Sequence, residues 1–169
     1  MWYNETKRGG WDMTTIQIAD HIFAVDVNKT KEYYQTHTLC DCDYCRNYYK
    51  QIKGKFPQLE AFLSQFGVDI SKPDEISMSY EMDDCIHYIM IDYTVSGKAE
   101  NIGQSKINIS DSLPFTLRIT DGFSSPNEQT SDYFTISIDT EFTLPRALSE
   151  PIQQKQNRTK NFFRKLFKA

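Results

Sequence analysis

The second half of the chain alternates apolar and polar residues with a period of two, and no helical pattern separates one alternating stretch from the next. Successive side chains of a β-strand point to opposite faces of a sheet, so this alternation predicts strands with one buried and one solvated face. Because helices are missing between them, the pattern disfavours parallel βαβ units and favours an antiparallel sheet. The alternating stretches are residues 75–82, 85–97, 105–110, 115–122 and 133–144.

Two helical segments are predicted ahead of these strands. The first begins at Asp43, where Asp41 or Asp43 would cap the first turn, because a carboxylate accepts hydrogen bonds from unpaired N–H groups. The second begins at Pro57, which suits the first helical position, and stops at Gly67, which favours a left-handed conformation. Apolar residues recur at helical spacing in both segments, at Tyr44, Cys45, Tyr48, Tyr49 and Ile52, and at Leu59, Phe62, Leu63 and Phe66.

The segment ahead of these helices has a weaker pattern. Residues 14–27 alternate in polarity and predict a strand, or a hairpin that turns at Ala19-Asp20. The polar stretch NKTKEYYQTHT, residues 28–38, then predicts a loop with one helical turn.

The 169 residues suit one domain that is long enough to bury a core. We predict an α+β domain over residues 13–152, with two early helices and a mainly antiparallel sheet, for which a sandwich is one arrangement. Residues 1–12 combine Gly-Gly with charges and lack periodicity, so a flexible leader outside the fold is expected there. Residues 153–169 are expected to form a basic amphipathic tail.

The net charge of -4 hides an asymmetry between this tail and the rest of the chain. Residues 155–169 hold six of the 19 Lys and Arg residues and none of the 23 Asp and Glu residues, so the first 154 residues carry 13 basic and 23 acidic groups. An acidic body repels phosphates, and we therefore expect no nucleic acid partner for the main domain.

The compartment is inferred from what the chain lacks. No stretch approaches the roughly 18 apolar residues of a membrane span, and the N-terminal residues lack the apolar region of a secretion signal. Three of the four cysteines crowd into residues 40–45, which is unlike a disulfide framework spread along a secreted domain. These features favour the reducing cytoplasm.

The crowded cysteines have the spacing of metal ligands. Cys42 and Cys45 form a C-x2-C pair, and Cys40 adds a third thiolate. Zinc is bound by thiolates and imidazoles, usually four of them, and short spacings bring two ligands onto one turn. His37 lies just upstream, and Cys85 and His87, at the start of a predicted strand, are distant candidates for the fourth ligand. The site that we predict uses the three clustered cysteines with His37 or Cys85. The cofactor that we expect at such a site is zinc.

Two other interpretations of the same cysteines stay open. The sequence CDYC at a helix start resembles the redox motif of glutaredoxins, where the helix N-terminus activates a thiol. Such a fold needs an apolar strand before the motif and a parallel core, and KTKEYYQTHTL is not an apolar strand. Alternatively, the cysteines are small apolar residues that only pack, with Cys45 under the helix.

The tail is the other feature that bears on partners. Phe162, Phe163, Leu166 and Phe167 lie on one face of a helix, and basic residues occupy much of the rest. Basic amphipathic helices of this kind lie on anionic membranes or dock on acidic proteins. We therefore expect weak anionic membrane contact through the tail, or docking to a protein partner.

Three stretches, CDCDYCRNYYKQI, LEAFLSQFGVDISKPDEI and IDTEFTLPRALSEP, resemble a family of uncharacterised bacterial proteins, mostly from Firmicutes. That family carries a C-x-C-x2-C-R-N element, a GID-x-x-KP helix exit and a terminal LPW-x-L-x-EP element. The resemblance covers roughly residues 14–152, but Arg146 stands where the family has Trp, and the basic tail extends beyond the family's usual end. It implies no activity, and it implies that the cysteine element is a family feature.

No nucleophile elbow, zinc-protease, phosphate-loop or dinucleotide-binding motif occurs in the chain. An enzyme is therefore not the favoured interpretation. We expect a non-catalytic cytoplasmic binding or interaction protein with a structural zinc site. The alternative is a thiol-dependent redox enzyme that uses the CDYC motif.

Overall fold

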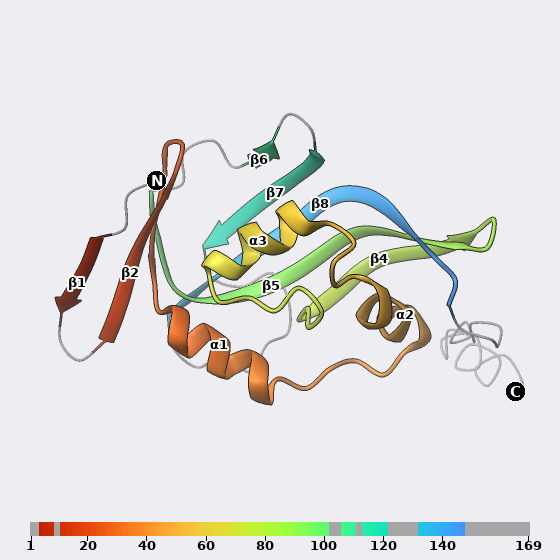
Figure 1. The fold of residues 1–169 in the computed structure, drawn as a ribbon, viewed down its shortest axis with the longest axis horizontal. Coiled ribbons are helices and arrows are strands. Elements are labelled where there is room, and N and C mark those ends of the chain that lie inside the picture. The colour runs from red at the N-terminus through yellow and green to blue at the C-terminus, as the bar shows by residue number, and fades with distance from the viewer. Residues whose placement is uncertain (1–3, 9–10, 102–105, 111–112, 122–131, 148–169) are drawn as a thin grey trace, which may run out of the picture.

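The computed structural model describes residues 4–8, 11–101, 106–110, 113–121 and 132–147, and it confirms the α+β class (Figure 1). The helices within these ranges are α1 (Val27–Thr36), α2 (Asp43–Gln51) and α3 (Pro57–Gln65). The strands are β1 (Asn4–Arg8), β2 (Trp11–Ile18), β3 (His21–Val25), β4 (Glu75–Met82), β5 (Cys85–Asn101), β6 (Lys106–Ser110), β7 (Leu113–Asp121) and β8 (Tyr133–Pro145).

The described strands form one open sheet rather than the two packed sheets of a sandwich. Every pairing in this sheet is antiparallel. The order across the sheet is β1-β2-β3-β5-β8-β7-β6, and β4 pairs with β5 outside this path. The central strand β5 is long enough to pair with β8 from Cys85 to Ser96, with β4 at its start and with β3 at its end.

Strand β5 pairs with β4 and with β3 along the same edge, but between these two it has no partner there among the described strands. Other groups form the hydrogen bonds of its backbone at that place. The Tyr34 hydroxyl of α1 donates to Thr94 O at 2.9 Å, and Ser96 N donates to the Thr30 hydroxyl at 3.0 Å. Thr94 N donates to the Asp74 carboxylate at 2.7 Å. Buried backbone groups need such partners, so α1 and Asp74, the residue before β4, complete the sheet here.

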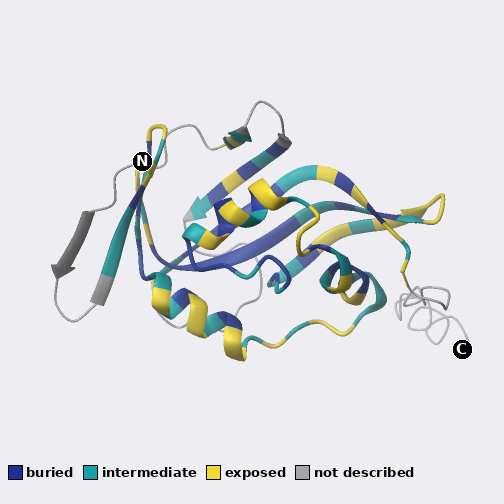
Figure 2. Ribbon diagram, viewed as in Figure 1, coloured by how far each residue is buried: buried dark blue, intermediate teal, exposed yellow. Residues whose placement is uncertain are grey.

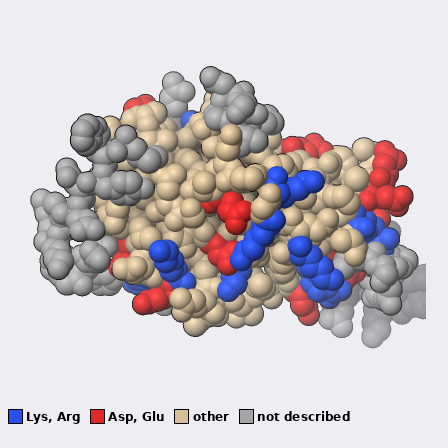
Figure 3. Space-filling view, viewed as in Figure 1, with Lys and Arg blue, Asp and Glu red and all other residues tan. Residues whose placement is uncertain are grey.

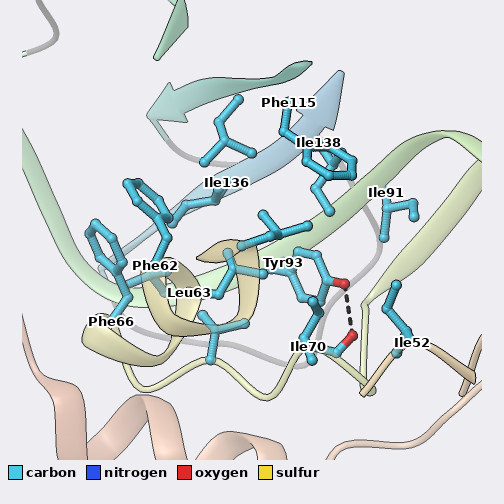
Figure 4. Close-up of a cluster of buried hydrophobic side chains, with 14 of the residues drawn as sticks. Ile52, Phe62, Leu63, Phe66, Ile70, Ile91, Tyr93, Phe115, Ile136 and Ile138 are labelled. Atoms are coloured by element: carbon cyan, nitrogen blue, oxygen red, sulfur yellow. Dashed lines mark hydrogen bonds between the residues drawn. The ribbon is translucent and has the colours of Figure 1, made fainter. Parts of the chain in front are cut away.

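The core lies between the helices and one face of the sheet (Figures 1 and 2). Figure 4 shows Phe62 and Leu63 of α3 and Phe66, which follows this helix, on the same side of the sheet as Ile136 of β8, all of them buried. Full burial of a side chain of this size contributes roughly 1.5–3 kcal/mol, so the contact between α3 and the sheet is a main source of stability. The buried β5 and β8 residues on this face are Ile86, Tyr88, Ile91, Tyr93, Val95, Phe134, Ile136, Ile138, Phe142 and Leu144.

One residue of β5 departs from the simple alternation. Ile91, Tyr93 and Val95 are buried as expected, but Ile89, which continues their period, is only half-buried. The register with β8 shifts between Tyr88 and Met90, and beyond this irregularity the buried positions are Ile86 and Tyr88. A bulge moves side chains to the opposite face, which a sequence pattern cannot reveal.

Two segments differ from their sequence-based expectations. Residues 28–36, expected as a loop with one helical turn, belong to the ten-residue helix α1, whose N-cap Asp26 accepts a hydrogen bond from Lys29 N at 2.9 Å. Part of the expected leader at residues 1–12 is strand, because residues 4–8 pair with β2, which itself begins at Trp11. The tail at 153–169 lies outside the described residues.

The predicted stop of α3 at Gly67 is confirmed, and it has a second cause. Gly67 has a φ of 82°, in the region that glycine adopts readily. A Cβ at this position would lie 2.5 Å from Val27 O at the start of α1. Glycine therefore both ends α3 and lets α1 approach it closely.

Candidate metal centre

The sulfur atoms of Cys40, Cys42 and Cys45 all lie within 4.8 Å of one another. Cys42 is the N-cap of α2 and has an extended backbone, with φ -68° and ψ 158°. Cys45 follows in the first turn of the helix, so the turn brings both sulfurs to one side, and the chain before the helix adds Cys40. All four cysteines of the chain are free thiols. Three thiols this close together suit a soft or borderline metal ion.

The three cysteines differ in exposure. Cys40 is exposed, Cys42 is intermediate, and Cys45 is buried with 5% of its surface accessible. Burial raises the pKa of the Cys45 thiol, and the adjacent Cys42 and Cys40 raise it further. A buried thiol beside two others therefore resists ionisation unless a cation lies among them, and metal ions provide that cation.

Arg46 fixes the loop that carries the cysteines. Its guanidinium donates to Asp41 O at 2.6 Å and also to the carboxylate of Asp43. The expected capping of α2 by Asp41 or Asp43 does not occur, because Cys42 is the N-cap and makes no side-chain capping bond. The backbone of residue 41 and the side chain of residue 43 instead hold Arg46.

Asn47 joins this helix to the sheet, and sequence reasoning assigned it no role. It is fully buried, and its amide donates to the Tyr88 hydroxyl at 3.2 Å and to Pro145 O at 3.3 Å. Its carbonyl oxygen accepts from Ala147 N at 2.8 Å. A buried amide that uses both its ends fixes α2 against β5 and the end of β8.

Tyr49, four residues after Cys45 on α2, is half-buried beside the thiols. Burial raises the pKa of its phenol, and Cys45, Cys40 and Cys42 raise it further. The same helix places Tyr48 in the core, where its hydroxyl bonds that of Tyr93, which in turn donates to Ile70 O at 2.8 Å. The cysteine cluster thus sits at the rim of a core that is rich in tyrosine.

His37 is not part of the three-sulfur group. Its ring is buried and stacks on Tyr33 with the ring centroids 5.0 Å apart. Nδ1 lies 3.9 Å from an Asp74 carboxylate oxygen, and Nε2 lies 3.3 Å from Pro73 O. Both ring nitrogens therefore face the segment that leads into β4.

Cys85, the other expected fourth ligand, is the first residue of β5 and lies opposite Met82 and Pro145 in the sheet. Among the His, Cys, Asp and Glu residues within the described ranges, the group with metal-binding geometry consists of Cys40, Cys42 and Cys45. The structure therefore brings together three of the five expected ligands.

No protein family, no curated protein and no solved structure matches this chain. The resemblance to the bacterial family therefore stays a prediction. Within the described ranges, no helix is both long and apolar enough to cross a membrane.

Proposed function

We propose that the protein is a non-catalytic binding or interaction protein of the cytoplasm, in which Cys40, Cys42 and Cys45 hold a zinc ion. The observation that carries this proposal is the closeness of the three sulfur atoms, within 4.8 Å of one another. One metal ion bonded to all three would fasten the loop before α2 to the first turn of that helix.

Zinc fits this set of donors best. Thiolates at C-x2-C spacing on a helix start are typical zinc ligands, and zinc needs no redox change to stay bound. Four free thiols are consistent with a reducing compartment, where zinc–thiolate sites persist. The proposed role is structural: metal binding stabilises the folded state, because the unfolded chain does not keep the three sulfurs together.

The test is the metal content of the reduced, purified full chain. We expect about one zinc per chain after zinc addition and removal of the excess, measured by elemental analysis. The Cys45→Ser variant should lose most of that zinc, and the Cys85→Ser variant, a matched change outside the group, should keep it. Zinc at about a hundred times its dissociation constant should also stabilise the wild type by about 2.7 kcal/mol. A folded wild type that takes up no zinc would contradict the proposal.

The thiol-dependent redox enzyme is less well supported. The described sheet is antiparallel, α2 follows directly after a non-helical loop rather than a strand, and burial raises the pKa of Cys45. We expect no disulfide reductase activity. Reductase activity together with a reactive thiolate at Cys42 in a thiol titration would replace the zinc proposal by the enzyme.

A further inference from the structure

We propose that the metal in this site keeps one coordination position open, and that a neutral imidazole nitrogen from outside the chain is the ligand that it takes there. This inference rests on the proposed metal binding by Cys40, Cys42 and Cys45. Closed structural zinc sites have four protein ligands, whereas sites with three protein ligands accept a water or an external ligand in the fourth position.

No other cysteine or histidine belongs to the three-sulfur group. The chain contains four cysteines and three histidines, and all seven lie within the described ranges. Three of the cysteines form the group, and the ligand atoms of the others lie outside it. A fourth cysteine or histidine ligand must therefore come from another molecule, unless one of these side chains moves.

The three histidines contact other groups of the chain. The His37 ring faces Asp74 and Pro73 O, as described above. His87 Nδ1 lies 2.6 Å from a carboxylate oxygen of Glu141, and its ring stacks on Tyr80 at 4.4 Å. His21 is 2% exposed in β3, with Nδ1 3.2 Å from Asp20. Each ring would have to leave these contacts to reach the metal.

Cys85 is held by the sheet rather than by its side chain. Its backbone is paired with both Met82 and Pro145 at the start of β5. Arg146 strengthens this end, because its amide donates to Asp84 O at 2.8 Å and its guanidinium lies 3.1 Å from Glu81. A movement of Cys85 toward α2 would break this strand end.

The open position would face solvent. Cys45 is buried, whereas Cys40 is exposed. A metal bonded to all three sulfurs would therefore have its remaining direction on the side of Cys40, where an external donor can approach.

Charge selects a neutral donor. Three thiolates already exceed the charge of a dication by one, and the carboxylates of Asp41 and Asp43 alternate with the cysteines in the sequence. The nearest balancing charge, Arg46, already bonds Asp43. A further carboxylate would add to this surplus, whereas imidazole brings no charge and is a good zinc ligand.

The experiment uses the reduced full chain loaded with Co²⁺, whose visible absorption reports the number and type of its ligands. Thiolate-to-metal absorption in the near ultraviolet should appear in the wild type, and its absence would mean that the metal proposal itself fails. Added imidazole should then shift the visible bands with saturation at one imidazole per metal. Acetate at the same concentration should not shift them. Visible bands unmoved by imidazole, with the thiolate absorption intact, would overturn the open position alone.

Two variants test whether the chain supplies the fourth ligand. Cys85→Ser and His37→Gln should both give the wild-type spectrum and the same response to imidazole. A spectrum changed by either substitution, with the protein still folded by circular dichroism, would overturn the proposal in favour of an internal ligand. A capped histidine peptide in a parallel titration distinguishes the sources of imidazole: tighter binding than free imidazole identifies a protein partner, and equal binding a small molecule. Both results support the open position.

Discussion

At the scale of single residues, Asn47 ties the helix that carries Cys45 to the sheet. It lies two residues after Cys45 on α2 and bonds groups of β5 and of the chain at the end of β8. Of the three cysteines only Cys45 is buried, so the amide of Asn47 and the neighbouring Tyr48, both buried, hold this part of the helix against the sheet.

We expect Asn47→Ala to lower the free energy of unfolding by about 2–4 kcal/mol, because it removes three hydrogen bonds and leaves buried partners unsatisfied. Gln51→Ala is the matched control: Gln51 also donates to Pro145 O, at 2.7 Å, but it is more exposed. That change should cost less than about 1 kcal/mol. Urea unfolding measures both, and equal losses would show that Asn47 has no special role.

At the scale of elements, the edge of β5 between β4 and β3 depends on Asp74, which directly precedes β4 and has a buried side chain. Its carboxylate accepts from Thr94 N and from the Tyr33 hydroxyl. Burial raises the pKa of Asp74, although hydrogen bonds from Tyr33 and the nearby His37 oppose part of that rise. The charged carboxylate is thus less favourable here than in the unfolded chain.

The sign of the pH dependence follows from that shift. A carboxyl whose pKa is raised by folding binds protons more tightly in the folded state, so its contribution to stability is present below the unfolded pKa and is lost as pH rises through the folded pKa. We expect the stability of the wild type relative to Asp74→Asn to fall as the pH rises from about 4 through the folded pKa of Asp74. Urea unfolding across this range measures it.

Asp69 lies in the same segment between α3 and β4 as Asp74, and it provides a control of opposite sign. Burial opposes ionisation there, but the Ser71 hydroxyl and amide hold the pKa of Asp69 below its usual value. Its contribution to stability is therefore present above the unfolded pKa and is lost as the pH falls through the folded pKa. The Asp69→Asn variant should be less stable than the wild type at neutral pH, and this difference in the free energy of unfolding should disappear at low pH. The same sign for both variants would contradict this assignment.

At the scale of the whole molecule, charge is distributed unevenly between body and tail. On the face shown in Figure 3, basic side chains stand beside acidic ones rather than forming one basic area. Among the described residues, Arg118 pairs with Asp139 at 2.6 Å and Lys98 with Asp132 at 2.9 Å. The unbalanced basic residues are those of 155–169, outside the described ranges.

We predict that this tail mediates weak, salt-sensitive binding to anionic membrane. Each basic residue near such a surface contributes about 1 kcal/mol, and burial of Phe162, Phe163, Leu166 and Phe167 adds roughly 25 cal/mol per Å². The full chain should sediment with anionic vesicles at low salt, and a variant that ends at Gln154 should not. Equal binding by the two, or binding that salt and neutral lipid leave unchanged, would mean that the tail is no electrostatic anchor.

The sequence alone determined the local structure. Alternation located β4 to β8, and helical spacing with Pro57 and Gly67 located α3, because these signals depend on residues close together in the chain. The three sulfurs of the candidate site were also predictable, since Cys42 and Cys45 share the first turn of a predicted helix and Cys40 is only two residues from Cys42. Helix α1 was missed because its buried residues, Thr30 and Tyr34, form no apolar stripe.

Only the tertiary structure decided what depends on contacts between distant segments. Thr30 and Tyr34 are buried because β5 leaves an edge unpaired that α1 completes, and nothing local in α1 indicates this. The open sheet and the bulge at Tyr88 likewise follow from pairing between strands. His37 and Cys85 were plausible ligands by residue type, but long-range hydrogen bonds and strand register place them elsewhere, because a side chain's position is set by the element that carries it.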